Sequence, residues 1–505
     1  IRDLVRSRGL GDVYKRQMNY WGMNINTWEE FYPRDGVTSP SYKNEWERYN
    51  RKEVADFLNW QCDLVNEYKR KDQFVTHCFM PDFHNIDQVE SFRQMQYPAI
   101  NVYHDVQDKQ DGQRIAYAGD FVRTVADNNY IVMETNAQGI GWDARTQFPP
   151  YDNQLRQNVY AHYASGANMV EYWHWHSIHN SFETYWKGLL SHDFKENDTY
   201  RSAKVIGKEF AELGSHLVNL KKHNKVGFLV SNEAQTALDW FPIDGTAGGG
   251  GACKYNDVVR YVYDQLYKLN VECDFLWPET ESFAQYDLLV VPALYAAPEA
   301  LLQKINDYVA AGGHLFTTFK TGFTDENLKV FHDSQPHILD QCLGISYSHF
   351  TFPKQVKLSG ETYHCEDNEL KNFMELVNPE GAQVLASYDH YNWKRYAAVT
   401  RNAYGKGTAT YLGCWTGDAM LREILTDVLK DAGLWGMEQE VEFPVIIKKG
   451  TNDLGKEVVY YLNYSPEVRN VIYHGTDGEE LFGKAAVTDG QVLEIGGWDL
   501  KIVER

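Results

Sequence analysis

The first two-fifths of the chain alternate between amphipathic stretches and short, wholly apolar runs. Apolar residues recur at helical spacing in four stretches, at 51–69, 87–95, 119–128 and 153–164. Apolar runs rich in β-branched and aromatic residues lie between them, at 74–80, 99–103, 130–134 and 169–175. Such runs are typical of strands that are buried on both faces of a parallel sheet. The pattern therefore predicts four β/α units, which is half the number that closes a (β/α)8 barrel.

A carboxylate ends the third apolar run, and aromatic residues gather just downstream of it. Glu134 closes the run that begins at Tyr130. Four tryptophans follow within 45 residues, Trp142, Trp173, Trp175 and Trp186. A buried indole needs a partner for its N–H group, so four tryptophans this close together are hard to place in a core alone. A lone Glu at a strand end is more often a solvated cap, but beside Trp, Glu and His it indicates the carbohydrate site of a barrel.

Three histidines accompany Glu134 in the loops that follow the predicted strands. They are His77, His104 and His176. In a (β/α)8 barrel these loops form the face on which chemistry occurs. A single His at such a place is more often a positioning group than a catalyst, so we expect the three histidines to orient other groups.

The second part of the chain predicts another α/β domain with a mostly parallel sheet. Apolar runs at 226–231, 287–294 and 313–319 alternate with helical stretches at 258–269 and 300–311. The glycine-rich segment 245–251, GTAGGGG, invites interpretation as a phosphate-binding loop. It has neither G-x-G-x-x-G nor G-K-[ST], and no strand leads directly into it, so we expect a surface loop.

The last part of the chain alternates apolar and polar residues in short runs. The runs lie at 458–462, 492–495 and 500–503, with turn signals at Asn452-Asp453 and Asp477-Gly478. This period of two is typical of strands that have one face on a core and one in water. Residues 441–505 therefore predict a small antiparallel β domain.

Length, charge and cysteine usage narrow the class of protein further. With 505 residues the chain is long enough for about three domains of roughly 150 residues each. Its formal net charge of −21 argues against nucleic acid or an anionic membrane as a partner. No apolar stretch approaches the roughly 18 residues that a membrane helix needs. The seven cysteines are scattered without a C-x-x-C pair, which favours reduced thiols in a cytoplasmic protein over disulfides or a metal site.

Two long, irregular segments carry a resemblance to a known family. Residues 134–177, ETNAQGIGWDARTQFPPYDNQLRQNVYAHYASGANMVEYWHWHS, and 182–193, FETYWKGLLSHD, resemble the second half of the catalytic barrel of glycoside hydrolase family 42, the β-galactosidases. Looser similarity extends from Met18 over nearly the whole chain. The resemblance implies hydrolysis of terminal, non-reducing β-D-galactosides by a retaining mechanism that uses no cofactor. It makes Glu134 the nucleophile, Trp142 the floor on which the sugar stacks, and Glu183 a ligand of galactose hydroxyls. Trp186 is a further expected sugar contact, at a position where some members carry His.

The resemblance also implies a domain order and an assembly. We expect a partial barrel with strands five to eight at 18–222, an α/β, amidotransferase-like trimerisation domain at 223–437, and a C-terminal β domain at 438–505. A homotrimer follows from the middle domain. The segment 7–17, SRGLGDVYKRQ, resembles a translated sequencing adapter. We therefore expect residues 1–17 to be foreign to the fold and the natural gene to be interrupted inside the barrel.

The family's acid/base is a Glu that follows Asn at the end of the fourth barrel strand. Three Asn-Glu pairs occur in this chain, Asn44-Glu45, Asn66-Glu67 and Asn232-Glu233. The first has no strand before it, the second lies inside a helix, and the third opens a loop of the middle domain. We expect all three pairs to be ordinary surface residues. The acid/base would then be missing, and the chain by itself would be inactive.

Two alternatives belong to other classes of protein. A non-catalytic sugar-binding relic would keep the tryptophans and the carboxylates without turnover. An amidotransferase-like binding module would rest on the middle domain alone. Catalysis by such a module needs a Cys at a strand-to-helix elbow with a His partner. The run 287–294 continues instead into Tyr295-Ala296-Ala297, and Cys414 comes late and lacks an obvious partner.

Overall fold

The structure is a computed structural model. It describes residues 20–21, 27–30, 32, 39–82, 86–138, 141–244 and 253–505. Residues 1–17, predicted to be foreign, and the glycine-rich segment 245–251 lie outside the described residues.

The first part of the described chain forms a four-stranded parallel sheet with the strand order β1-β2-β3-β4. Its strands are β1 (Cys78–Phe79), β2 (Ala99–Val102), β3 (Tyr130–Asn136) and β4 (Ala167–Trp173). Its helices are α3 (Pro40–Tyr68), α4 (Gln88–Phe92), α5 (Gln113–Val125), α6 (Gln154–Ala164) and α7 (Asp198–Leu217). Each strand but the last is followed by a helix that leads to the next strand, so the predicted β/α units are confirmed. The strand predicted at 74–80 is only two residues long in the structure. It is an edge strand, and Phe74 of the predicted run is 47% exposed.

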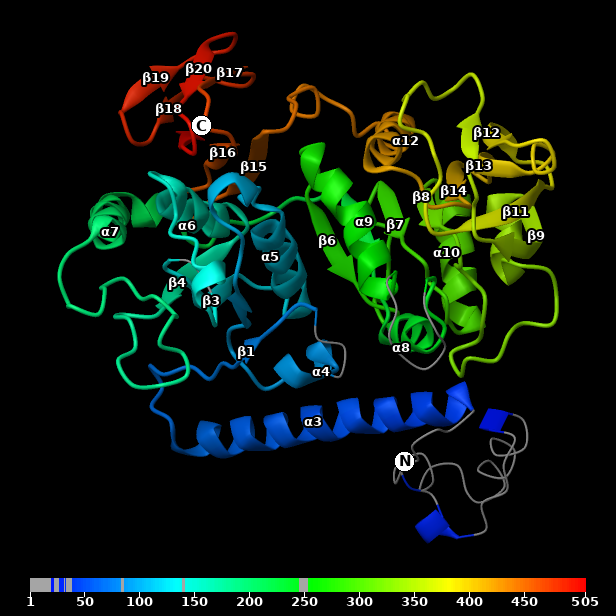
Figure 1. Ribbon diagram of the computed structural model, residues 1–505, viewed down its shortest axis with the longest axis horizontal. Helices are drawn as coiled ribbons and strands as arrows, with labels where there is room; N and C mark the ends of the chain where they lie inside the picture. Colours follow the sequence, from blue (N-terminus) through cyan, green and yellow to red (C-terminus); the bar gives the residue numbers. More distant parts are fainter. Residues whose placement is uncertain are drawn as a thin grey trace.

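The middle part forms a ten-stranded sheet. Its strands are β5 (Val226–Leu229), β6 (Cys273–Leu276), β7 (Leu288–Val291), β8 (His314–Thr318), β9 (Ile345–Thr351), β10 (Lys357–Ser359), β11 (Met374–Pro379), β12 (Gln383–Asp389), β13 (Ala397–Tyr404) and β14 (Gly407–Leu412). Its helices are α8 (Asn232–Trp240), α9 (Tyr255–Lys268), α10 (Glu299–Ala311), α11 (Asp340–Leu343) and α12 (Asp418–Asp431). Figure 1 shows α9 lying over β6 and β7, and α12 packs beside α9, where Arg422 donates to Oε1 of Gln265 at 3.1 Å.

The sheet is mixed, so the prediction of a mostly parallel sheet is wrong. The strands β14, β8, β7, β5 and β6 are parallel neighbours in that order. Strands β9 to β13 extend the sheet through antiparallel pairs. The predicted strands at 226–231, 287–294 and 313–319 all belong to the parallel part. The antiparallel part lies within 345–404, where the sequence carries none of the apolar runs used for the prediction.

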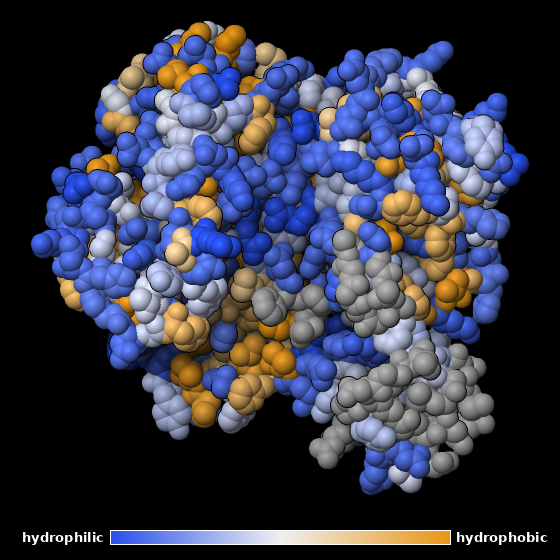
Figure 2. All heavy atoms as spheres, in the orientation of Figure 1, coloured by the Kyte–Doolittle hydropathy of each residue, from blue (hydrophilic) through white to orange (hydrophobic). Residues whose placement is uncertain are grey.

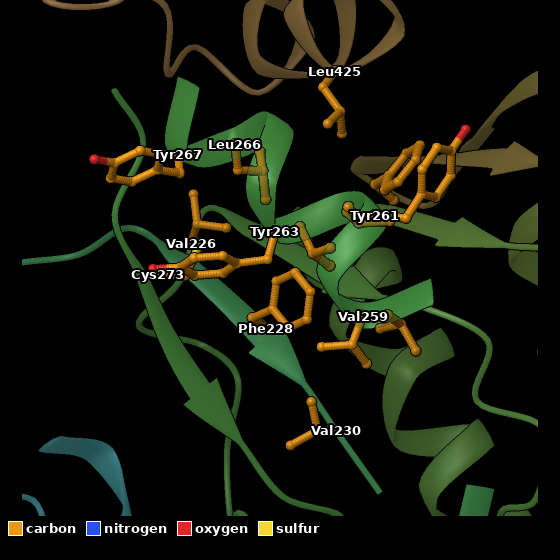
Figure 3. Close-up of a cluster of buried hydrophobic side chains, with 14 of the residues drawn as sticks. Val226, Phe228, Val230, Val259, Tyr261, Tyr263, Leu266, Tyr267, Cys273 and Leu425 are labelled. Atoms are coloured by element: carbon orange, nitrogen blue, oxygen red, sulfur yellow. The ribbon is translucent and has the colours of Figure 1, made fainter. Parts of the chain in front are cut away.

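The parallel strands are buried because helix α9 covers them with large apolar side chains. In Figure 3 Val226 and Phe228 of β5 lie beside Tyr263 of α9 and Cys273 of β6. Phe228 and Tyr263 are almost fully buried, with ring centroids 6.0 Å apart. The hydroxyl group of Tyr263 donates to Oδ2 of Asp120 on α5 at 2.7 Å, so this core also connects the middle sheet to the first part of the chain.

The C-terminal part forms two small antiparallel sheets, as predicted. The five-stranded sheet has the order β15-β16-β21-β18-β19, and β17 pairs with β20. The strands are β15 (Val445–Thr451), β16 (Glu457–Asn463), β17 (Arg469–Ile472), β18 (Gly478–Glu480), β19 (Ala485–Val487), β20 (Val492–Ile495) and β21 (Leu500–Glu504).

A network of buried charges joins the three parts of the chain. Glu272, just before β6, forms ion pairs with Lys222 at 2.6 Å and with Lys448 of β15 at 2.8 Å. Lys448 is also 3.9 Å from Asp120, which in turn pairs with Arg123 of α5 at 3.5 Å. Burial by itself would raise the pKa of Glu272, but the two lysines outweigh it and lower the pKa to about 2. A carboxylate with two buried cations cannot be removed without leaving both unpaired.

We expect Glu272→Gln to destabilise the fold by about 3 kcal/mol at neutral pH, because Lys222 and Lys448 lose their shared counter-charge. The folded-state pKa of Glu272 lies below its ordinary value of 4.5, so its contribution is complete above about pH 4.5. That contribution is lost as the pH falls toward about 2. Urea unfolding from pH 7 to pH 2.5 should therefore show a difference from wild type that shrinks only below about pH 4.5. The exposed Glu281→Gln is the control, and a pH-independent difference would contradict this role of Glu272.

Helix α3 is held against the middle sheet by a second set of charges, which corrects the expectation for two of the Asn-Glu pairs. Glu233, in the first turn of α8, accepts from Arg48 at 3.1 Å and from Arg51 at 3.3 Å, both on α3. Asn44 and Glu45 are buried at the same joint. These two pairs are therefore not surface residues, and Asn232 begins a helix rather than a loop. Only Asn66-Glu67 fits the prediction, with Glu67 exposed.

Candidate active site

Strand β3 presents Glu134 at an irregular point of the first sheet. Its register against β2 shifts between Ile100 and Asn101, and its register against β4 shifts between Val132 and Thr135. Irregular pairing of this kind is a β-bulge, which turns side chains away from the regular alternation. Met133 and Glu134 are both partly exposed at the bulge, whereas the preceding residues of the strand are buried. The bulge therefore leaves the carboxylate accessible at the end of an otherwise buried strand.

The carboxylate of Glu134 is held by a tyrosine from the neighbouring strand. The hydroxyl group of Tyr103, which directly follows β2, donates to Oε2 of Glu134 at 2.6 Å. Burial and this hydrogen bond raise the pKa of Tyr103, so the phenol keeps its proton and remains a donor. A donor fixed on one carboxylate oxygen orients the group and leaves the other oxygen available to a ligand.

A row of aromatic rings leads from the surface to this pair. Trp142 stacks on Phe182, with centroids 5.3 Å apart and planes at 8°. Trp142 also meets the edge of Trp186 at 5.2 Å, and Trp186 meets the edge of Tyr103 at the same distance. Trp142 remains 55% exposed. The exposed indole face of Trp142 suits the apolar face of a sugar ring. The Glu134 carboxylate, held by Tyr103, suits the hydroxyl groups of the same ring.

Glu183 lies close to the same group of residues. Burial is the main cause of the raised pKa of Tyr103 and of the lowered pKa of His174, and the charge of Glu183 acts on both groups. The loop is fixed by short contacts, since the N–H of Trp186 donates to the carbonyl oxygen of Glu183 at 2.9 Å. The structure thus brings Glu134, Trp142 and Trp186 together through Tyr103, and Glu183 belongs to the turn that carries Trp186.

The predicted histidines do not reach the carboxylates. His104 is buried, its backbone N–H donates to Oδ1 of Asn136 at 3.1 Å, and burial lowers its pKa to about 4. His176 uses Nδ1 to contact the carbonyl oxygen of Ser177 at 2.9 Å. His77 precedes β1 rather than following it. His104 and His176 therefore have supporting contacts to the backbone, in keeping with the prediction that they are positioning groups.

Tyr103 and His174 are the site residues that the sequence reasoning missed. In the sequence both lie inside predicted apolar runs, at 99–103 and 169–175, and only the structure makes each of them the first residue after a strand. A tyrosine or histidine at a strand end is common, so the signal is weak without the contacts. A cavity of about 280 Å³ lies beside this region and is lined by His104, Asn136 and Phe148.

Other kinds of site find little support in the structure. Within the described ranges, no three His, Cys, Asp or Glu side chains are grouped so that they could hold a metal ion. No described helix is long and apolar enough to cross a membrane.

An accessible carboxylate near the end of a parallel strand, with two tryptophans and a second carboxylate in the neighbouring loops, is the arrangement of a glycoside hydrolase site on a barrel-type sheet. Family comparison agrees. Residues 8–213 match the glycoside hydrolase 42 family described as beta-galactosidase, and residues 230–435 match the beta-galactosidase trimerisation domain. The chain therefore belongs to glycoside hydrolase family 42.

Curated relatives are distant but extensive. Beta-galactosidase bgaB of Geobacillus kaustophilus is 26% identical over 418 residues, which cover 81% of this chain and 60% of that protein. Beta-galactosidase LacA of Lactobacillus acidophilus is 24% identical over 518 residues, which cover 97% of this chain and 73% of that protein. The chain thus spans about three-fifths of the length of the first relative and about three-quarters of the second.

Solved structures share the fold over the whole chain. The beta-galactosidase from Bacillus circulans sp. alkalophilus superposes with a TM-score of 0.89 at 19% identity, covering 100% of this chain and 76% of that one. A catalytic mutant of Gan42B, a family-42 beta-galactosidase from G. stearothermophilus, gives 0.88 at 17% identity, covering 100% and 75%. The fold is that of the family-42 enzymes, a (β/α)8 barrel with additional domains.

Proposed function

We propose that the protein to which this chain belongs hydrolyses terminal, non-reducing β-D-galactosides with retention of configuration. The contact between Tyr103 and Glu134 carries the proposal, because it gives an oriented carboxylate beside an aromatic platform. In this mechanism Glu134 attacks the anomeric carbon and forms a glycosyl-enzyme, which water then hydrolyses. Trp142 and Trp186 stack against the sugar, and Glu183 accepts hydrogen bonds from its hydroxyl groups.

A retaining mechanism needs a second carboxyl group about 5–5.5 Å from the nucleophile, to protonate the leaving oxygen and then activate water. Glu45 and Glu233 cannot fill this role, since both lie at the joint between α3 and the middle sheet. We infer that the acid/base comes from barrel strands outside this chain. The first sheet would then supply strands five to eight, within residues 18–222.

The exposed surface of α3 supports this view of the barrel. Figure 2 shows hydrophobic residues gathered at the lower edge of the molecule, where Figure 1 places α3. The exposed apolar residues of this helix include Phe57, Trp60, Leu64, Val65 and Tyr68. Contiguous apolar patches of this kind mark surfaces that another element covers. The remaining β/α units of a closed barrel are the covering element that we propose.

The middle part, residues 223–437, is proposed to be the trimer-forming domain and residues 438–505 the C-terminal β domain. The family match to a trimerisation domain over 230–435 supports this assignment. A homotrimer of the longer protein is the expected assembly, with a β-galactoside as its substrate.

Glu183→Ala in the longer protein should reduce kcat/KM by about 30-fold or more. A charged hydrogen bond to substrate contributes roughly 2 kcal/mol, and the loss appears in kcat/KM when the bond tightens in the transition state. Steady-state kinetics on nitrophenyl-β-galactoside and nitrophenyl-β-glucoside would measure both the rate and the preference between sugars. Glu196→Ala, an exposed carboxylate nearby on the chain, is the matched control. Unchanged rate and unchanged sugar preference would make Glu183 a structural residue.

A sugar-binding relic remains the second candidate, because the aromatic platform would serve it equally well. The hydrolase and the sugar-binding relic differ only in whether the bound galactoside is hydrolysed. A longer protein that binds galactosides through Trp142 but fails to hydrolyse nitrophenyl-β-galactoside would favour the relic.

A further inference from the structure

A larger cavity lies away from Glu134, where α3, α4 and α5 meet the middle sheet. Its volume is about 480 Å³, within the usual range for small-molecule sites. The described residues that line it come from six separate stretches of the chain and include Arg51, Asp87, Phe121, Glu233, Trp277 and Glu279. None of the four predicted active-site residues takes part.

The cavity lies at the carboxyl ends of β5 and β6, beside the place where open α/β sheets bind ligands. Counted along the chain, the five parallel strands of the middle sheet have the spatial order 2-1-3-4-5, with β5 as the first and β6 as the second. The order reverses between β5 and β7, and ligands bind outside the carboxyl ends of the strands at such a switch point. Residues 230–233 follow β5 and residues 277–279 follow β6, and both segments line the cavity. The cavity thus lies on the β5 side of the switch point.

Asp87, Glu233 and Glu279 are three of the carboxylates that line this space. The charges of Glu233 and Asp87 each raise the pKa of Glu279, and the charge of Glu233 raises that of Asp87. Glu233 is neutralised by Arg48 and Arg51 at 3.1 and 3.3 Å. For Asp87 and Glu279 burial is the largest influence, and it raises the pKa of both. The lining therefore offers carboxylate acceptors and guanidinium donors side by side.

Aromatic residues complete the lining. The ring of Trp277 meets the edge of Phe121 at a centroid distance of 5.1 Å, and Tyr117 and Tyr255 lie in the same wall. Five carboxylates and three cationic side chains line the cavity in total, which disfavours an anionic ligand. An amine would meet the arginines as like charges. A hydroxyl group both donates and accepts, so a polyhydroxyl ligand uses both kinds of partner.

We propose that this cavity is a second saccharide site, which binds a neutral mono- or disaccharide outside the catalytic barrel. The ring of Trp277 provides the stacking face, Asp87 and Glu279 accept from sugar hydroxyl groups, and Arg51 donates to them. The site is independent of the proposed hydrolysis, because it shares no residue with the group around Glu134.

Isothermal titration of lactose and galactose into the 505-residue chain tests the proposal, with spermidine and inorganic phosphate as comparison ligands. Trp277→Leu should weaken sugar binding about tenfold, because it removes the stacking ring. Glu279→Gln keeps the size of the side chain and removes its charge, and it should weaken binding severalfold. Trp142→Ala and Glu183→Ala report on the catalytic group and should leave this binding event in place.

Each outcome of these titrations either supports the second site or overturns it. Sugar binding that survives Trp142→Ala and weakens in both Trp277→Leu and Glu279→Gln supports the second site. Binding that disappears with Trp142→Ala and survives Trp277→Leu places the sugar in the barrel and overturns the proposal, while the proposed hydrolysis stands. The absence of any sugar binding, or a preference of the cavity for spermidine or phosphate, also overturns it.

Discussion

Glu134→Ala, made in the longer protein with a closed barrel, should abolish retaining hydrolysis of nitrophenyl-β-galactoside. Loss of a nucleophile in a hydrolase costs on the order of 10⁴–10⁶-fold in kcat. The variant keeps Tyr103 and the aromatic row, so substrate should still bind. The vacated space beside Tyr103 would admit a small anion that can take over the attack. Turnover should therefore return when azide is supplied, with a galactosyl azide of inverted configuration as the product.

Product stereochemistry by NMR, together with kcat, measures this result. Glu361→Ala, at an exposed position in the middle part of the chain, is the matched control and should leave turnover unchanged. A Glu134→Ala protein that retains near wild-type turnover without azide would remove Glu134 from the mechanism. Rescue with retained configuration would assign it the role of acid/base instead.

The 505-residue chain by itself should hydrolyse nitrophenyl-β-galactoside negligibly. Two causes act together. A general acid contributes about 10²–10⁴-fold, and the second described carboxylate of the site, Glu183, is assigned to the sugar hydroxyl groups. Barrels also depend on closure, and the four-stranded first sheet leaves β1 and β4 as edges whose inward side chains lack their opposing layer. The chain should accordingly bind a hydrophobic dye strongly.

Hydrolysis assays and dye fluorescence on the purified chain measure both effects, with the chain extended by the upstream β/α units as the control. The extension should restore turnover and suppress dye binding together. Family-like turnover by the 505-residue chain would contradict the proposal of a missing acid/base and would require a catalytic acid among the residues already present.

The pattern of apolar residues in the sequence was sufficient to predict the strands that carry the candidate site. Glu134 ends an apolar run whose length and composition admit few structures other than a buried strand, and the tryptophans downstream are too many for a core. Their convergence on one carboxylate follows from parallel strands ending at the same edge. The orientation of Glu134 was not predictable, because it depends on a bulge and on Tyr103, whose hydroxyl group could have met many acceptors.

The burial of charged residues was the second feature that the sequence did not predict. Glu45 and Glu233 look like solvated residues in the sequence, since acidic residues are rarely buried unless paired. For Glu233 the partners Arg48 and Arg51 belong to a helix far away in the chain, and no local pattern reveals that pairing. Glu45 has Arg48 three residues away on its own helix, but its burial depends on the middle part of the chain, which the local sequence does not reveal. The antiparallel strands within 345–404 were missed for a related reason, because their partners are set by register rather than by apolar runs.

The charge network around Glu272 has a consequence for how the molecule comes apart. Modular enzymes usually lose their domains one after another on heating, each with its own transition. Here, separation of α5, β6 or β15 from the others would leave a buried ion without its partner, so opening any one boundary weakens the other two. The three parts should thus melt as one cooperative unit, and none of them is a module that can be excised and grafted elsewhere intact.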